Sequence, residues 1–156
     1  MTMMEEKATD YVTEFVTVMI GNHLFGLPIS RVQDVFVPDR LTRVPLAPPE
    51  VAGILNLRGR VVTAIEMRTR LDLGTRQAGQ PVMAIGIELK GESYGLLVDS
   101  VGEVMQLPNR ACEAKPANLD ARIARVAAGI YRLEGQLMIV LDVDRVLDIK
   151  PSAVAA

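Results

Sequence analysis

The sequence predicts a mainly β protein built as two small SH3-like barrels of five strands each, with a few short helices. Three observations lead to this fold class. The chain contains an internal repeat, its apolar runs are short and separated by glycine-containing turns, and aromatic residues make up only 4% of its 156 residues. Many short strands joined by tight turns are typical of small barrels.

Two blocks of sequence occur twice, in the same order. Phe25-Gly26-Leu27 recurs as Tyr94-Gly95-Leu96, an offset of 94 − 25 = 69 residues. Ala52-Gly53-Ile54 recurs as Ala128-Gly129-Ile130, an offset of 128 − 52 = 76 residues. Because two collinear blocks at consistent offsets are not expected by chance, the chain is interpreted as a duplication of one unit.

The duplication sets the expected organisation of the chain. We expect one domain over residues 11–150, with copy one at about 11–75, copy two at about 81–150, and flexible tails at 1–10 and 151–156. The offset grows by 76 − 69 = 7 residues, so copy two contains a short insertion between Met105 and Ala128. Prolines and asparagines in that interval indicate a loop.

Each copy is predicted to contain two β-hairpins. Gly21-Asn22 separates two β-branched apolar runs, which is a two-residue hairpin signal, and Lys90-Gly91-Glu92, Arg58-Gly59 and Glu134-Gly135 occupy similar positions. The expected strand pairs are Phe15–Ile20 with His23–Leu27, Val82–Leu89 with Ser93–Val98, Ile54–Leu57 with Val61–Ile65, and Ile130–Leu133 with Leu137–Leu141.

A short helix is expected to close each copy. Asp142 or Asp144 can cap one or two helical turns in which Val143, Val146 and Leu147 share a face. Residues 66–71 occupy the same place in copy one. The three prolines within residues 45–51 exclude a regular strand there.

The two copies are expected to share one hydrophobic core. Neither copy is long enough to bury a large core by itself. Repeats that cannot bury their own apolar face pack against a neighbour, so a common apolar layer between the two units is predicted.

Composition excludes several classes of protein. The formal net charge is −2, without the basic patch expected of a nucleic-acid binder or the polybasic cluster that binds anionic membranes. The N-terminus lacks the apolar core of a signal peptide, and no apolar run approaches the ~20 residues of a membrane span. The single cysteine fits a reducing cytoplasm, and any association with a membrane is expected to go through a partner.

The residues that could carry chemistry are few. His23 lies beside a turn and has no second histidine to work with, and no catalytic pattern surrounds Cys112. Asp142 and Asp144 could suggest a metal pair, but helix capping is the preferred interpretation. With no phosphate-binding loop and no zinc spacing either, we expect no enzymatic activity, no cofactor and no metal.

The copies differ most in charge at their second turns. Arg58 and Arg60 of copy one correspond to Glu134 and Gln136 of copy two. Turn residues are often simply solvated, and the comparison of copies alone does not decide between that explanation and a binding site.

The segment Gly53–Val62 resembles the G-x-x-N-L-R-G-x-x-V signature of the bacterial chemotaxis coupling protein family CheW, and a similar module forms the regulatory domain of the chemotaxis histidine kinase CheA. The likeness also includes Phe25-Gly26-Leu27 and Gly95–Asp99, and it extends over about residues 14–149. Thr63 and Glu66-Met67 depart from the usual Pro and Asp-Leu, which bears on the choice of partners. The chain carries no phosphotransfer, ATP-binding or receiver segment, so it looks like the free-standing adaptor.

The resemblance implies two SH3-like barrels and two partners. One is the cytoplasmic tip of methyl-accepting chemoreceptors, and the other is the regulatory domain of CheA, placed loosely on barrel ends of both copies. The family's receptor-contact positions correspond here to Val32, Asp34, Gly53, Asn56 and Arg58. The implied role is a cytoplasmic adaptor recruited to receptor arrays.

A groove between the barrels, lined by Val32, Val35 and Ile54, is expected to accept apolar side chains of a helical receptor hairpin. Arg58 would supply a charge-assisted hydrogen bond, and Gly53 would permit close backbone approach. The alternatives are a CheW-like scaffold of a chemosensory pathway outside motility and, more distantly, a small β-barrel hydrolase.

Overall fold

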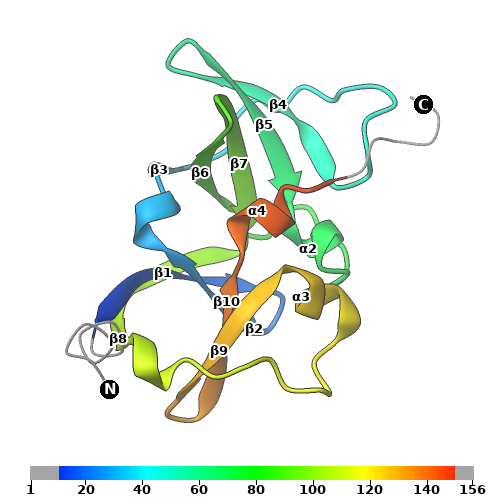
Figure 1. Cartoon of the computed structure of the whole chain (residues 1–156). Helices are drawn as coiled ribbons and strands as arrows, with labels where there is room; N and C mark the ends of the chain where they lie inside the picture. The colour runs from blue at the N-terminus through cyan, green and yellow to red at the C-terminus, as the bar shows by residue number, and fades with distance from the viewer. Residues whose placement is uncertain (1–10, 150–156) are drawn as a thin grey trace.

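Two five-stranded sheets carry the fold in the computed structural model, which describes residues 11–149 (Figure 1). Sheet one has the strand order β8-β1-β2-β10-β9, and sheet two has the order β3-β6-β7-β5-β4. The strands are β1 (Val12–Ile20), β2 (His23–Pro28), β3 (Asp34–Phe36), β4 (Val51–Leu57), β5 (Arg60–Glu66), β6 (Met83–Leu89), β7 (Glu92–Val98), β8 (Ser100–Pro108), β9 (Ala127–Leu133) and β10 (Gln136–Leu141). The predicted mainly β fold with two five-stranded units is confirmed, while the predicted tails lie outside the described residues.

Each sheet takes strands from both copies of the sequence repeat. Sheet one joins β1 and β2 of copy one to three strands of copy two, and sheet two joins β6 and β7 of copy two to three strands of copy one. The copies meet through the parallel pairs β10–β2 and β5–β7 and through the antiparallel pairs β1–β8 and β3–β6. Exchanging every strand for its equivalent in the other copy converts one strand order into the other, so the sheets are related by a pseudo-twofold arrangement. The barrels therefore do not coincide with the sequence copies.

The four predicted hairpins are present, and each has a two-residue turn. The residue pairs that close them are Ile20–His23, Leu57–Arg60, Leu89–Glu92 and Leu133–Gln136. Every turn contains one glycine with a positive φ, between 61° and 83°. Such turns match the twist of the flanking strands and need residues that tolerate positive φ, which is why glycine recurs at these points.

Three short helices lie near the junction of the sheets, α2 (Met67–Arg70), α3 (Ala121–Val126) and α4 (Val143–Val146) (Figure 1). The helices expected after Glu66 and Asp142 are confirmed, with each carboxylate accepting a backbone hydrogen bond as the N-cap. Helix α3 lies in the insertion for which the sequence predicts a loop, so that prediction is wrong for residues 121–126. Asp120 caps it, and Ile123 and Val126 bury its inner face.

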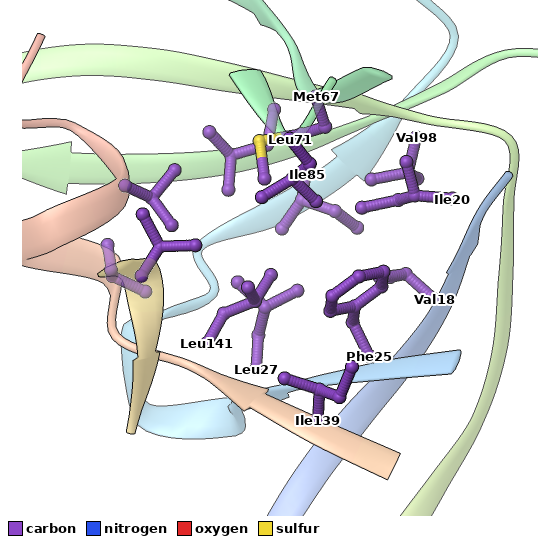
Figure 2. Close-up of a cluster of buried hydrophobic side chains, with 14 of the residues drawn as sticks. Val18, Ile20, Phe25, Leu27, Met67, Leu71, Ile85, Val98, Ile139 and Leu141 are labelled. Atoms are coloured by element: carbon purple, nitrogen blue, oxygen red, sulfur yellow. The ribbon is translucent and has the colours of Figure 1, made fainter. Parts of the chain in front are cut away.

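The main core is shared by the two sheets, as predicted. Figure 2 shows Val18, Ile20 and Phe25 of sheet one facing Ile85 of sheet two, with Met67 close by. Phe25 and Ile85 are fully buried, and burying a large apolar side chain contributes roughly 1.5–3 kcal/mol. This common layer holds the two sheets as one body and fixes the surfaces that each presents.

Candidate functional site

An ion pair joins strand β3 to the β4–β5 turn. The Nη1 atom of Arg58 lies 3.2 Å from Oδ2 of Asp34, which is the first residue of β3. The side chain of Arg58 is 77% exposed and that of Asp34 is 29% exposed. Two residues that the resemblance named separately are therefore brought together, and the cation faces solvent, where a partner can reach it.

Asn56 shapes the turn that presents Arg58. Its Oδ1 atom accepts a hydrogen bond from the backbone N–H of Gly59 at 2.8 Å. Arg58 has φ 53° and Gly59 has φ 83°, so both turn residues are in the left-handed region. The left-handed conformation is unfavourable for arginine, and the hydrogen bond between Gly59 and Asn56 stabilises the turn that requires it. The Asn-Leu-Arg-Gly sequence thus has a structural explanation.

Gly53 is buried beneath the loop that precedes β4. A Cβ atom at this position would lie 2.5 Å from the backbone oxygen of Thr42. Thr42 and Ile54 exchange two backbone hydrogen bonds of 2.8 Å, which hold the loop against β4. The close backbone approach expected at Gly53 is therefore made by the chain's own loop.

The same arrangement recurs in copy two. Glu113 and Ile130 exchange two backbone hydrogen bonds of 2.8 and 3.0 Å, and a Cβ on Gly129 would lie 3.0 Å from the oxygen of Glu113. The repeated Ala-Gly-Ile block thus marks the place where a preceding loop adds to the sheet edge in both halves.

Val32 belongs to the interior more than to the surface. It is half-buried, packs against the main core, and donates its backbone N–H to Ile29 at 3.1 Å. Val35, three residues later, is exposed. Val32 thus anchors the chain entering β3 and holds Asp34 in place.

A depression of about 410 Å³ opens next to the Asp34–Arg58 pair, within sheet two. Its lining does not include Val32, Val35 or Ile54, so this concave surface differs from the predicted groove between the barrels. Apolar and aromatic side chains form much of its wall, namely Phe36, Leu57, Val62, Ile87 and Tyr94. Gln33, Asp34, Arg58 and Arg60 supply its polar rim.

The polar groups around this depression are mostly paired with each other. Gln33 donates to Glu88 at 2.8 Å, and the Tyr94 hydroxyl donates to Glu92 at 2.9 Å. Burial, helped by that bond and the charge of Glu92, raises the pKa of Tyr94. Sequence reasoning assigned no role to Phe36 or Tyr94, because their convergence depends on the pairing of β3 with β6 and of β5 with β7.

The profile of the CheW-like domain matches residues 14–150. The chain belongs to the CheW-like domain family. Relatives named chemotaxis protein CheW include one from Klebsiella aerogenes, 25% identical over 134 residues (86% of this chain and 81% of the relative), and one from Rhizobium meliloti, 25% identical over 146 residues (94% of each). The crystal structure of the scaffolding protein TtCheW from Thermoanaerobacter tengcongensis superposes with a TM-score of 0.79 at 26% identity, covering 88% of this chain and 89% of that one.

The sequence offers four residues of this CheW-like domain as candidates for catalysis or metal binding, and the structure shows the position of each. His23 is exposed, with its ring 6.2 Å from that of Phe25, and Cys112 is exposed. Asp142 caps α4, as the capping interpretation predicted, and Asp144 pairs with Arg31 at 3.0 Å.

Two further findings concern only the CheW-like domain as described, residues 11–149. No group of three or more His, Cys, Asp or Glu side chains in this range is arranged to hold a metal ion. None of the helices in the same range has the length and apolar character needed to cross a membrane.

Proposed function

We propose that this chain is a chemotaxis adaptor that couples methyl-accepting chemoreceptors to the histidine kinase CheA. One observation carries the proposal: Asp34, Asn56 and Arg58 converge on one exposed end of sheet two, beside an apolar-walled depression. This convergence occurs in a chain that matches the CheW-like domain over residues 14–150, and its relatives bear the name chemotaxis protein CheW.

The receptor-binding surface consists of Asp34, Asn56 and Arg58. Val32 and Gly53 support this surface from the interior of the protein. Arg58 offers a cation to a carboxylate or carbonyl on the receptor tip, and charge-assisted hydrogen bonds are stronger than neutral ones. Asn56 holds the turn, and Asp34 directs the guanidinium. Val32 and Gly53 are buried or half-buried and act through the backbone of β3 and the loop at Thr42.

Apolar burial supplies the remaining affinity. A helical receptor hairpin can lay an apolar side chain against the exposed edge of sheet two, in the helix-in-groove mode. Val35 and Val61 are 38% and 64% exposed on β3 and β5. They offer apolar area that a receptor side chain would cover on binding.

The adaptor holds the receptor and the kinase in a fixed arrangement and performs no chemical step. The kinase's regulatory domain binds a second surface, and the shared core keeps both surfaces in one fixed relation. Receptor state then changes the population of active kinase rather than any reaction in the adaptor. The protein works in the cytoplasm and reaches the membrane array through its partners.

Reconstitution tests the proposal. Purified CheA and receptor-containing membranes are mixed with and without the chain, and kinase autophosphorylation is measured with and without attractant. We expect receptor-dependent activation and its inhibition by attractant only when the chain is present. An equal response without the chain would refute the adaptor function.

A further inference from the structure

We infer that Arg60 is a second partner-binding cation, which pairs with a carboxylate beside an apolar side chain that the partner inserts into the depression of sheet two. This inference rests on the proposed function, because it describes how the receptor segment is recognised at the same end of the sheet. It adds a residue to the surface and assigns a chemistry to the partner.

Of the two arginines that line the depression, only Arg58 has an ion pair among the described residues, at 3.2 Å from Asp34. Arg60 donates a hydrogen bond from Nη2 to the hydroxyl of Ser93 at 3.1 Å and has no ion pair within residues 11–149. Glu88 and Glu92 keep their negative charge, because they accept hydrogen bonds from the neutral side chains of Gln33 and Tyr94 at 2.8 and 2.9 Å. A guanidinium has five N–H donors, so most of its capacity remains for a partner's oxygen atoms.

The Ser93 bond also holds Arg60 in place. Ser93 and Arg60 both line the depression and also a second, more open hollow, which Glu92 lines as well. A guanidinium held at the rim loses less conformational freedom on binding than one that is free in solvent.

The depression next to Arg60 is suited to an apolar side chain. Its wall combines the buried Val62 and Ile87 with the half-buried Leu57, Phe36 and Tyr94. The absence of a side chain at Gly86 leaves space for β3, because a Cβ there would lie 3.3 Å from the Cβ of Asp34. Its volume of about 410 Å³ is at the lower end of the roughly 300–1,000 Å³ found for ligand sites. A leucine, isoleucine or phenylalanine from a helical segment fits this chemistry.

The second copy does not reproduce this combination. Gln136 and Glu134 occupy the positions equivalent to Arg60 and Arg58. The site that binds an apolar side chain and a neighbouring carboxylate of the partner is therefore restricted to sheet two, although the two sheets have the same strand topology.

The test uses the full chain and a purified cytoplasmic fragment of a methyl-accepting receptor. Affinities of the wild type, Arg60→Ala and Arg60→Glu are measured at low and high salt. We expect a loss of about fivefold for R60A and at least about tenfold for R60E, with a weaker salt dependence for R60A. The matched control is Arg125→Glu, an exposed arginine on α3, which should bind within about twofold of the wild type.

Charge reversal on the receptor then identifies the carboxylate. Each Asp and Glu of the receptor tip is changed singly to Lys and tested against R60E, and one of them should restore binding. Wild-type affinity of R60E, or the absence of any restoring substitution, would overturn this inference while leaving the adaptor function standing. If the wild-type chain itself fails to bind the receptor fragment, both the inference and the proposed function fail.

Discussion

Arg68 and Asp99, from opposite copies of the repeat, are joined by two hydrogen bonds. The Nε atom of Arg68 donates to Oδ1 of Asp99 at 2.9 Å, and its Nη2 atom donates to Oδ2 at 2.7 Å. Arg76, in the segment between the copies, adds a bond of 2.7 Å to Asp99 and one of 2.8 Å to Glu66. Asp99 also accepts the backbone N–H of Gly21 at 2.9 Å. One carboxylate thus connects α2, the linker and the β1–β2 turn.

Replacing Asp99 by Asn should destabilise the fold. The side chains of Arg68, Arg76 and Asp99 are only 12–18% exposed, so the substitution leaves poorly solvated cations without their partner. Breaking one member of a buried ion network costs several kcal/mol, and we expect about 2–4 kcal/mol here, measured by urea denaturation. Asp72→Asn is the matched control, because Asp72 is 64% exposed in its pair with Arg122 and its φ of 56° is tolerated by asparagine. Equal losses in the two variants would contradict this account.

The contribution of Asp99 should disappear in acid. Burial raises the pKa of the carboxyl, but the hydrogen bonds from Arg68, Arg76 and Gly21 outweigh it, so the pKa of Asp99 lies below its ordinary value. The stabilisation is therefore present above the unfolded-state pKa of about 3.9 and is lost as the pH falls through the lower folded-state pKa. The difference in unfolding free energy between wild type and D99N should be constant from about pH 7 to 5 and shrink below about pH 4. A difference that persists undiminished at pH 2 would show that the charge of Asp99 is not the cause.

Arg58→Glu should abolish receptor binding while leaving the stability of the fold nearly unchanged. The exposed Arg58–Asp34 pair contributes little to folding, so the free energy of unfolding should change by no more than about 1 kcal/mol. The new carboxylate would face Asp34 and repel an acidic partner group, so co-sedimentation with receptor membranes should be lost. Glu134→Arg, at the equivalent turn of copy two, is the control and should retain binding. If R58E unfolds, Arg58 is structural and its assignment to the receptor surface is wrong.

The local elements of this fold could be predicted, whereas their assembly could not. Turns such as Gly21-Asn22 and Arg58-Gly59 contain their own conformational signal, so the hairpins were found from neighbouring residues alone. The parallel pairing of β5 with β7 depends on residues far apart in the chain, such as Ile65 and Leu96. Both copies have similar apolar patterns, so the sequence did not indicate which copy completes which sheet.

For the candidate site, the residues could be named from the sequence, but the contacts between them could not. The family resemblance named Asp34 and Arg58, but their contact arises from the position of β3 against the β4–β5 turn and has no sequence signal. Helix α3 differs from the loop predicted for its segment. Asp120, Ile123 and Val126 supply a cap and helical spacing, but the prolines and asparagines earlier in the same insertion indicate a loop.

Gly53→Ala should be more harmful than Gly59→Ala. At Gly53 a methyl group would meet the backbone oxygen of Thr42 at 2.5 Å, which no side-chain rotation can relieve. Gly59 has open space around it, so alanine there pays only for a positive φ, about 1 kcal/mol. We expect G53A to lose about 2–4 kcal/mol and to weaken receptor binding through displacement of the loop at Thr42. Comparable urea midpoints for the two variants would contradict the steric explanation.

Separating the copies should produce two fragments that fold only together. Residues 1–80 contain β1 to β5 and residues 81–156 contain β6 to β10, so neither fragment holds a complete sheet. Separation breaks the strand pairs β1–β8, β2–β10, β3–β6 and β5–β7. The first fragment alone would expose apolar residues such as Phe25 and the second such as Leu96, which are fully buried in the intact chain. We expect each fragment to lack cooperative urea unfolding and an equimolar mixture to recover it, with the two fragments co-eluting in size-exclusion chromatography. Since the copies are joined by two parallel pairs, two antiparallel pairs and the common core, cooperative unfolding of either fragment alone would mean that a copy can form its own barrel by a different strand pairing.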